Sequence, residues 1–127
     1  MELLIKKQAL LSALAGAKSA YPSEFICLLT GRKEKGNILI EDTLIPPGIM
    51  VSETMSSFSE WMLPVIIGMI GTFHSHPNGY SHPSAADLRL FSKKGGVHFI
   101  AGYPYWETNV EAYIGGGKRV GFRVLGE

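Results

Sequence analysis

Three histidines and one aspartate, all of metal-binding type, fall within one short segment, H74-S-H-P-N-G-Y-S-H-P-S84-A-A-D87. Side chains two apart on a strand point to the same face, so His74 and His76 can converge on one ion. Ser84 and Asp87 are three apart at the start of an expected helix, which puts them on one helical face. Two imidazoles and one carboxylate from adjoining elements predict a zinc site with three protein ligands, His74, His76 and Asp87.

Three protein ligands are typical of a catalytic zinc site, whose remaining position is open to water. Hydrolysis at such a site also needs a base that moves a proton from water to the departing amine. Glu24 opens an apolar, strand-like segment and is the candidate for this role. Spacing alone does not bring that segment to the metal. We expect one zinc ion per chain.

The same residues also have a purely structural interpretation. Ser84-x-x-Asp87 before a helix is the pattern of a capping box, in which both side chains satisfy backbone groups of the first turn. A His-x-His pair by itself is common on surfaces and in cores. His82 lies in a second Ser-His-Pro segment and suits a solvated histidine in a turn. Residue types alone therefore leave metal binding and helix capping both open.

Hydrophobic periodicity and turn residues predict the elements that must position these side chains. A first helix is expected over residues 3–17, ending before Tyr21-Pro22, and a second over residues 83–94. Strands are expected over residues 24–30, 38–45, 65–73, 97–101, 110–114 and 119–125. Residues 32–37 and 115–118 are expected to form turns, the second of them closing a hairpin. Without a repeat or linker, residues 1–127 are expected to form a single domain.

The bulk composition is that of a soluble globular domain, because 46% of the 127 residues are hydrophobic and 18% are charged. A formal net charge of +1 predicts no nucleic-acid or membrane partner. The single cysteine, Cys27, excludes an internal disulfide, which fits the cytoplasm, and its apolar neighbours favour a buried, inert thiol. Lys6 and Lys7 interrupt the apolar N-terminus, and residues 61–73 are too few to span a bilayer, so no export signal or membrane element is expected.

The spacing closely resembles the signature of the JAMM (MPN-domain) zinc isopeptidase family. That signature is an upstream glutamate, then H-x-H, seven residues, S, two residues and D. His74, His76, Ser84 and Asp87 match each of its fixed positions. The segment P22-S-E24-F-I-C-L-L-T-G31 resembles the first strand of the family, whose glutamate matches Glu24.

The resemblance implies a role for each matched residue. His74, His76 and Asp87 would bind zinc, Glu24 would be the general acid and base, and Ser84 would help to stabilise the oxyanion. The implied fold is α/β, with a mixed, largely antiparallel curved sheet flanked by helices, of the JAMM/MPN-like and cytidine-deaminase-like type.

The resemblance also implies a substrate class. Family members cut isopeptide or peptide bonds after the C-terminal glycine of ubiquitin or ubiquitin-like proteins. This chain resembles the compact archaeal stand-alone type, so we expect small archaeal modifiers or sulfur-carrier proteins joined to lysine. The segment 52–60 is the expected resting place of the modifier tail, with Thr54 and Met55 as candidate contacts. Two alternatives stay open: a non-catalytic module that binds ubiquitin-like proteins or scaffolds a complex, and a metallopeptidase that processes a sulfur-carrier protein in biosynthesis.

Overall fold

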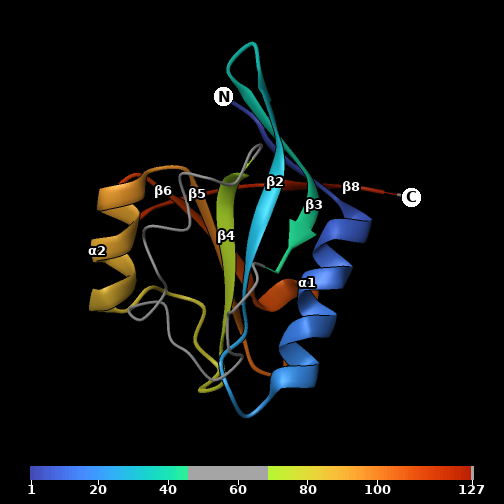
Figure 1. Cartoon of the computed structure of the whole chain (residues 1–127), viewed down its shortest axis with the longest axis vertical. Coiled ribbons are helices and arrows are strands. Elements are labelled where there is room, and N and C mark those ends of the chain that lie inside the picture. The colour runs from blue at the N-terminus through green and yellow to red at the C-terminus, as the bar shows by residue number, and fades with distance from the viewer. Residues whose placement is uncertain (46–68, 127) are drawn as a thin grey trace.

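The computed structural model describes residues 1–45 and 69–126. In this part of the chain, eight strands form one sheet in the order β7-β6-β5-β4-β2-β3-β1-β8, with helices α1 and α2 on its opposite faces (Figure 1). The strands are β1 (Leu3–Lys6), β2 (Ile26–Glu34), β3 (Asn37–Leu44), β4 (Met69–His76), β5 (Val97–Gly102), β6 (Val110–Ile114), β7 (Lys118–Val120) and β8 (Arg123–Leu125). The helices are α1 (Lys7–Ala20), α2 (Ala85–Lys94) and the short 3-10 helix η3 (Glu107–Asn109).

Within the described residues, four of the strand pairs are antiparallel and three are parallel. The predicted mixed and largely antiparallel sheet is therefore confirmed. Of the helices that the structure describes, none combines the length and the apolar character needed to cross a membrane.

Alternation of side chains along the strands divides the core into two layers. The larger layer lies on the face covered by α1 and includes Leu14, Leu29 and Phe73. The smaller layer lies on the face covered by α2 and includes Ile26, Leu28, Phe91, Ile100 and Tyr113. Cys27 is completely buried in the larger layer, where burial raises the pKa of its thiol to about 12. This agrees with the expected inert thiol.

The N-terminus differs from the predicted helix over residues 3–17, because Leu3–Lys6 form strand β1 and the helix begins only at Lys7. Leu3 and Ile5 are buried on alternate positions, and β1 pairs in parallel with β3 and β8. These partners lie far along the chain, so the local pattern of four residues does not reveal them. The helix ends at Ala20, before Tyr21-Pro22 as predicted.

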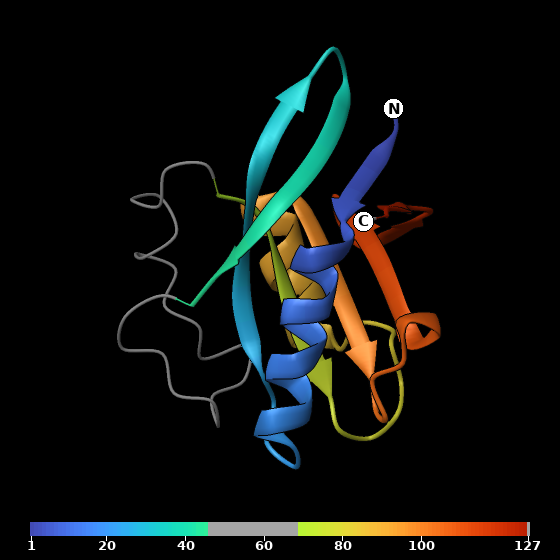
Figure 2. The ribbon, with the colours of Figure 1, turned by 90° about the vertical axis from the view of Figure 1, so that its right-hand side faces the viewer.

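Strands β2 and β3 form a longer hairpin than predicted, and its tip projects beyond the body of the sheet (Figure 2). The charged residues 32–34 belong to β2 rather than to a turn over 32–37. The turn itself is formed by Lys35 and Gly36, which both have positive φ, as a two-residue type I′ turn requires. Exposure on both faces allows a charged sequence to continue as a strand here.

The C-terminal segment also differs from the prediction. Residues 119–125 are not one strand but two, with Gly121 and Phe122 between them. Strand β7 pairs with β6 in the predicted hairpin, whereas β8 pairs with β1 at the opposite end of the strand order. Only a strongly curled sheet lets two strands joined by such a short link reach its opposite ends.

Strand β4 is central in the sheet, between β2 and β5. It was predicted over residues 65–73, of which 65–68 lie outside the described residues. The strand continues through His76, so both candidate histidines belong to it. The predicted strands over 97–101 and 110–114 and the helix over 83–94 are confirmed to within a few residues.

Candidate metal centre

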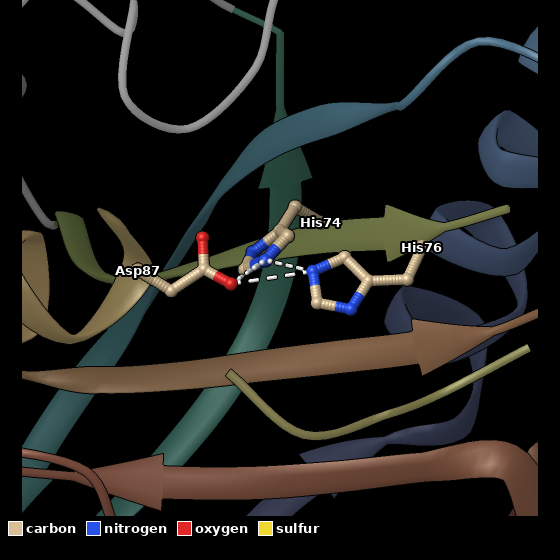
Figure 3. A group of neighbouring side chains, drawn as sticks. All are labelled: His74, His76 and Asp87. Atoms are coloured by element: carbon tan, nitrogen blue, oxygen red, sulfur yellow. Dashed lines mark hydrogen bonds and ion pairs between the residues drawn. The ribbon is translucent and has the colours of Figure 1, made fainter. Parts of the chain in front are cut away.

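His74 and His76 lie at the end of β4 on the face that α2 covers, and both imidazoles approach the carboxylate of Asp87 (Figure 3). Asp87 belongs to the first turn of α2. The exposed fractions are 0% for His74, 8% for His76 and 3% for Asp87. The strand and the helix thus bring together, away from solvent, the three residues that were predicted as ligands.

The three ligand-type atoms form a nearly equilateral triangle. Nε2 of His74 lies 3.1 Å from Nε2 of His76, and Oδ2 of Asp87 lies 3.1 Å and 3.2 Å from these two atoms. Tetrahedral zinc with bonds of about 2.0–2.1 Å requires its ligand atoms to be about 3.3 Å apart. Among the described residues, these three form the one group of His, Cys, Asp or Glu with such a convergence. Their number, type and spacing fit a zinc ion.

A backbone carbonyl holds the imidazole of His76 in the orientation that a metal ligand needs. Its Nδ1 lies 3.0 Å from the carbonyl oxygen of Tyr80. A carbonyl oxygen only accepts, so Nδ1 donates its hydrogen to Tyr80, and Nε2, which faces Asp87 and His74, is the atom that would offer its lone pair to a bound metal ion. Sequence reasoning missed this contact because a backbone carbonyl leaves no signature in residue type.

The capping box that was considered as the alternative to a metal site is also present. Ser84 Oγ accepts a hydrogen bond from the Asp87 N–H at 3.1 Å, and Asp87 Oδ2 accepts one from the Ser84 N–H at 2.9 Å. The same Oδ2 atom faces both histidines. The two interpretations are therefore compatible, because the cap orients the carboxylate toward the imidazoles.

Electrostatics keep the carboxylate ionised. Burial alone would raise the pKa of Asp87, but hydrogen bonds from His74 and His76 outweigh it and hold that pKa well below its usual range. For His76, burial would lower the pKa, but the hydrogen bond and charge of Asp87, together with the charge of Glu24, raise it overall. An ionised carboxylate at neutral pH is the form that binds a cation.

Glu24 is placed beside this centre by the pairing of β2 with β4. Ile26 lies opposite His74. The next pair is joined by two hydrogen bonds: the Phe25 N–H donates to Ser75 Oγ at 2.8 Å, and the Ser75 N–H donates to the Phe25 carbonyl at 2.9 Å. Continuing the register by one more pair puts Glu24 opposite His76, on the same face of the sheet. Its charge contributes to the raised pKa of His76, which agrees with that position.

Ser75 is a residue that the sequence did not single out. It lies between the two histidines but points to the other face, where its hydroxyl accepts from the backbone next to Glu24. This bond ties the segment before β2 to the strand that carries His74 and His76. His82, by contrast, is exposed, and its ring lies 5.3 Å from that of Tyr80, outside the group of three.

Comparisons with known proteins agree with this geometry. Residues 6–113 match the family of prokaryotic homologues of the JAB domain. A probable metalloprotease of Haloferax volcanii is 32% identical over 120 residues, which span 90% of this chain and 74% of that protein.

Solved structures give the same result. A JAB1/MPN domain protein from Archaeoglobus fulgidus has a TM-score of 0.74 and 31% identity, with 98% of each chain covered. A second structure, described as the JAMM metalloprotease-like zinc site in the proteasome and signalosome, has the same TM-score and identity and covers 98% of this chain and 99% of its own. A protein from Desulfitobacterium hafniense shares the fold, at 21% identity and a TM-score of 0.73, over 98% of this chain and 92% of that one. The resemblance stated from the sequence and the expected fold are confirmed.

Two histidines in matching Ser-His-Pro segments offer a direct test of the ligand set. We expect His76→Ala to weaken zinc binding by more than about 100-fold, because loss of a ligand exceeds the 10–100-fold effect of an outer partner. His82→Ala should leave zinc affinity unchanged, since His82 lies outside the group. Competition with a colorimetric chelator measures both. Weakened binding in His82→Ala with normal binding in His76→Ala would show that the wrong histidine was assigned.

Proposed function

This chain belongs to the family of prokaryotic homologues of the JAB domain, and on that premise we propose that it is a zinc-dependent peptidase or isopeptidase. The observation that carries the proposal is the buried triangle of His74, His76 and Asp87, with Glu24 two residues before the neighbouring strand β2. Two nitrogens and one carboxylate oxygen form a donor set that zinc accepts, and three protein ligands leave a further position for the reaction. We propose one zinc ion per chain.

When bound, zinc supplies a Lewis acid that polarises the scissile carbonyl and acidifies water. Glu24 takes the proton of the attacking water on a carboxylate oxygen and then delivers it to the departing amine. The hydroxyl oxygen of Ser84 accepts a hydrogen bond from the backbone N–H of Asp87, so the hydroxyl hydrogen can donate to another group. It donates to the substrate oxygen on which negative charge develops.

For the substrate, we propose the bond after the C-terminal glycine of a ubiquitin-like or sulfur-carrier protein joined to lysine. The family resemblance of His74, His76, Ser84, Asp87 and Glu24 supports this class. The proposal includes action in the cytoplasm, without a nucleic-acid or membrane partner. The segment 52–60, with Thr54 and Met55 as proposed contacts of the modifier tail, lies outside the described residues.

A substitution at Glu24 can test catalysis separately from metal binding, because Glu24 is proposed as the base and not as a zinc ligand. We expect Glu24→Gln to keep its zinc and to lower kcat by at least about 100-fold, because the amide has no basic oxygen to take the proton. The substrate is a ubiquitin-like protein joined through its C-terminal glycine to the lysine of a fluorescent peptide. Glu34→Gln, at the exposed far end of β2, is the matched control and should cleave normally.

Cleavage by Glu24→Gln at the wild-type rate would contradict the assignment of the base. Bound zinc in the wild-type protein without cleavage of either a ubiquitin-like or a sulfur-carrier conjugate would favour the non-catalytic binding module instead. Chelator treatment should abolish wild-type cleavage, and added zinc should restore it.

Ser84 has a helix-capping role as well as a proposed catalytic one, and the two can be separated. Replacing serine by glycine at the N-cap position of a helix lowers the stability of the protein by only a few tenths of a kcal/mol, but glycine has no hydroxyl to donate. We therefore expect Ser84→Gly to lower kcat by about 100-fold with a nearly unchanged free energy of unfolding. Ser84→Thr, which keeps the hydroxyl, should retain most of the activity. Equal activity of the glycine variant and the wild type would exclude the donor role.

A further inference from the structure

The face of the sheet that carries the histidine ligands also carries a cross-strand row of buried polar residues. Thr72 of β4 lies opposite His98 of β5, and His98 lies opposite Tyr113 of β6. The exposed fractions of these three residues are 0%, 0% and 5%. Thr72 precedes His74 by two positions, so both side chains point to the same side of β4.

Both ring nitrogens of His98 have a partner. Nε2 lies 2.7 Å from the carbonyl oxygen of Gly95, and Nδ1 lies 2.7 Å from Oγ1 of Thr72. Because the carbonyl only accepts, Nε2 carries the hydrogen, and the neutral ring accepts from the Thr72 hydroxyl at Nδ1. Burial lowers the pKa of His98 to about 4, in agreement with a neutral ring. The two bonds fix the plane of the imidazole.

The ring of His98 contacts helix α2 and the residue that follows it. Its face stacks on Phe91, with the ring centroids 4.0 Å apart and the planes 10° from parallel. Phe91 follows Asp87 by four residues, so the two side chains lie on the same face of the helix. Gly95, whose carbonyl accepts from His98, is the residue directly after the helix. His98 therefore connects the middle and the end of α2 to β4 through Thr72.

Tyr113 supports the other end of the helix. Its hydroxyl donates to the carbonyl of Ser81 at 2.9 Å, just before α2, and its ring lies 6.3 Å from that of Phe91. The capping bonds between Ser84 and Asp87 lie within the helix start and move with it. They orient the carboxylate but do not set the distance from α2 to β4. Contacts that cross from the helix to the sheet must set that distance.

We propose that His98, oriented by Thr72, is a positioning residue of the metal centre. His98 fixes helix α2 relative to β4 so that Asp87 reaches His74 and His76. The inference rests on the proposed zinc binding. His98 acts through Phe91 and Gly95. Because a zinc ion requires its ligand atoms within a few tenths of an ångström, loss of this support loosens the site before it unfolds the domain.

The test measures the zinc dissociation constant by chelator competition and the absorption spectrum of the cobalt(II)-loaded protein, which reports ligand geometry. Thr72→Val removes the hydroxyl at nearly constant shape, and Thr72→Ser restores it. His98→Asn keeps an acceptor near the Nδ1 position but removes the stacking on Phe91 and the bond to Gly95. Ile40→Val, in the core layer of the opposite face, controls for general loss of stability.

We expect Thr72→Val and His98→Asn to weaken zinc binding 10–100-fold and to alter the cobalt spectrum. Thr72→Ser and Ile40→Val should bind both metals as the wild type does. Wild-type affinity in Thr72→Val and His98→Asn would overturn the inference, as would equal weakening in Ile40→Val. Failure of the wild-type protein itself to bind zinc would overturn the proposed function and this inference with it.

Discussion

Asp87 carries an ionised carboxylate that is almost completely buried, and a buried charge is stable only when other groups pair with it. The backbone of Ser84 and the imidazoles of His74 and His76 supply these partners at 2.9–3.2 Å. Every element around the site contributes to this arrangement. Helix α2 presents the carboxylate at its first turn, β4 presents both histidines on one face, and the curled sheet holds the two elements together. The arrangement that stabilises the buried, ionised carboxylate also brings together the three ligand atoms of a divalent-cation site.

Side chains of β4 alternate between the two faces of the sheet, so neighbouring residues of this strand have different roles. His74 and His76 point toward α2 and form the centre, whereas Phe73 and Ser75 point toward α1. Ser75 anchors the backbone beside Glu24 from that other side. A single strand thus positions two metal ligands on one face and, on the other, the segment that carries the proposed general base. The chemistry of the site depends on packing against both helices.

Much of the site was predictable from local pattern, because its spacing follows the geometry of regular structure. His74 and His76 are two apart on a strand, and Ser84 and Asp87 are three apart at a helix start. What the residues themselves did not reveal depends on pairing between distant segments. The charge of Glu24 acts on His76 because β2 lies antiparallel to β4 and brings the preceding segment alongside, and the strand at Leu3 exists only because β3 and β8 flank it. His98 looked unremarkable in sequence, since its partners Thr72 and Gly95 come from separate elements.

The measurement that tests the central claim most directly is anomalous diffraction at the zinc absorption edge from crystals of the zinc-loaded protein. We predict one strong peak within about 2.0–2.2 Å of Nε2 of His74, Nε2 of His76 and a carboxylate oxygen of Asp87. Glu24 should lie beside the ion without binding it. A zinc peak at His82 or at another surface site, with no peak among His74, His76 and Asp87, would contradict the account. Asp87 would then act with Ser84 only as a helix cap, beside two buried histidines.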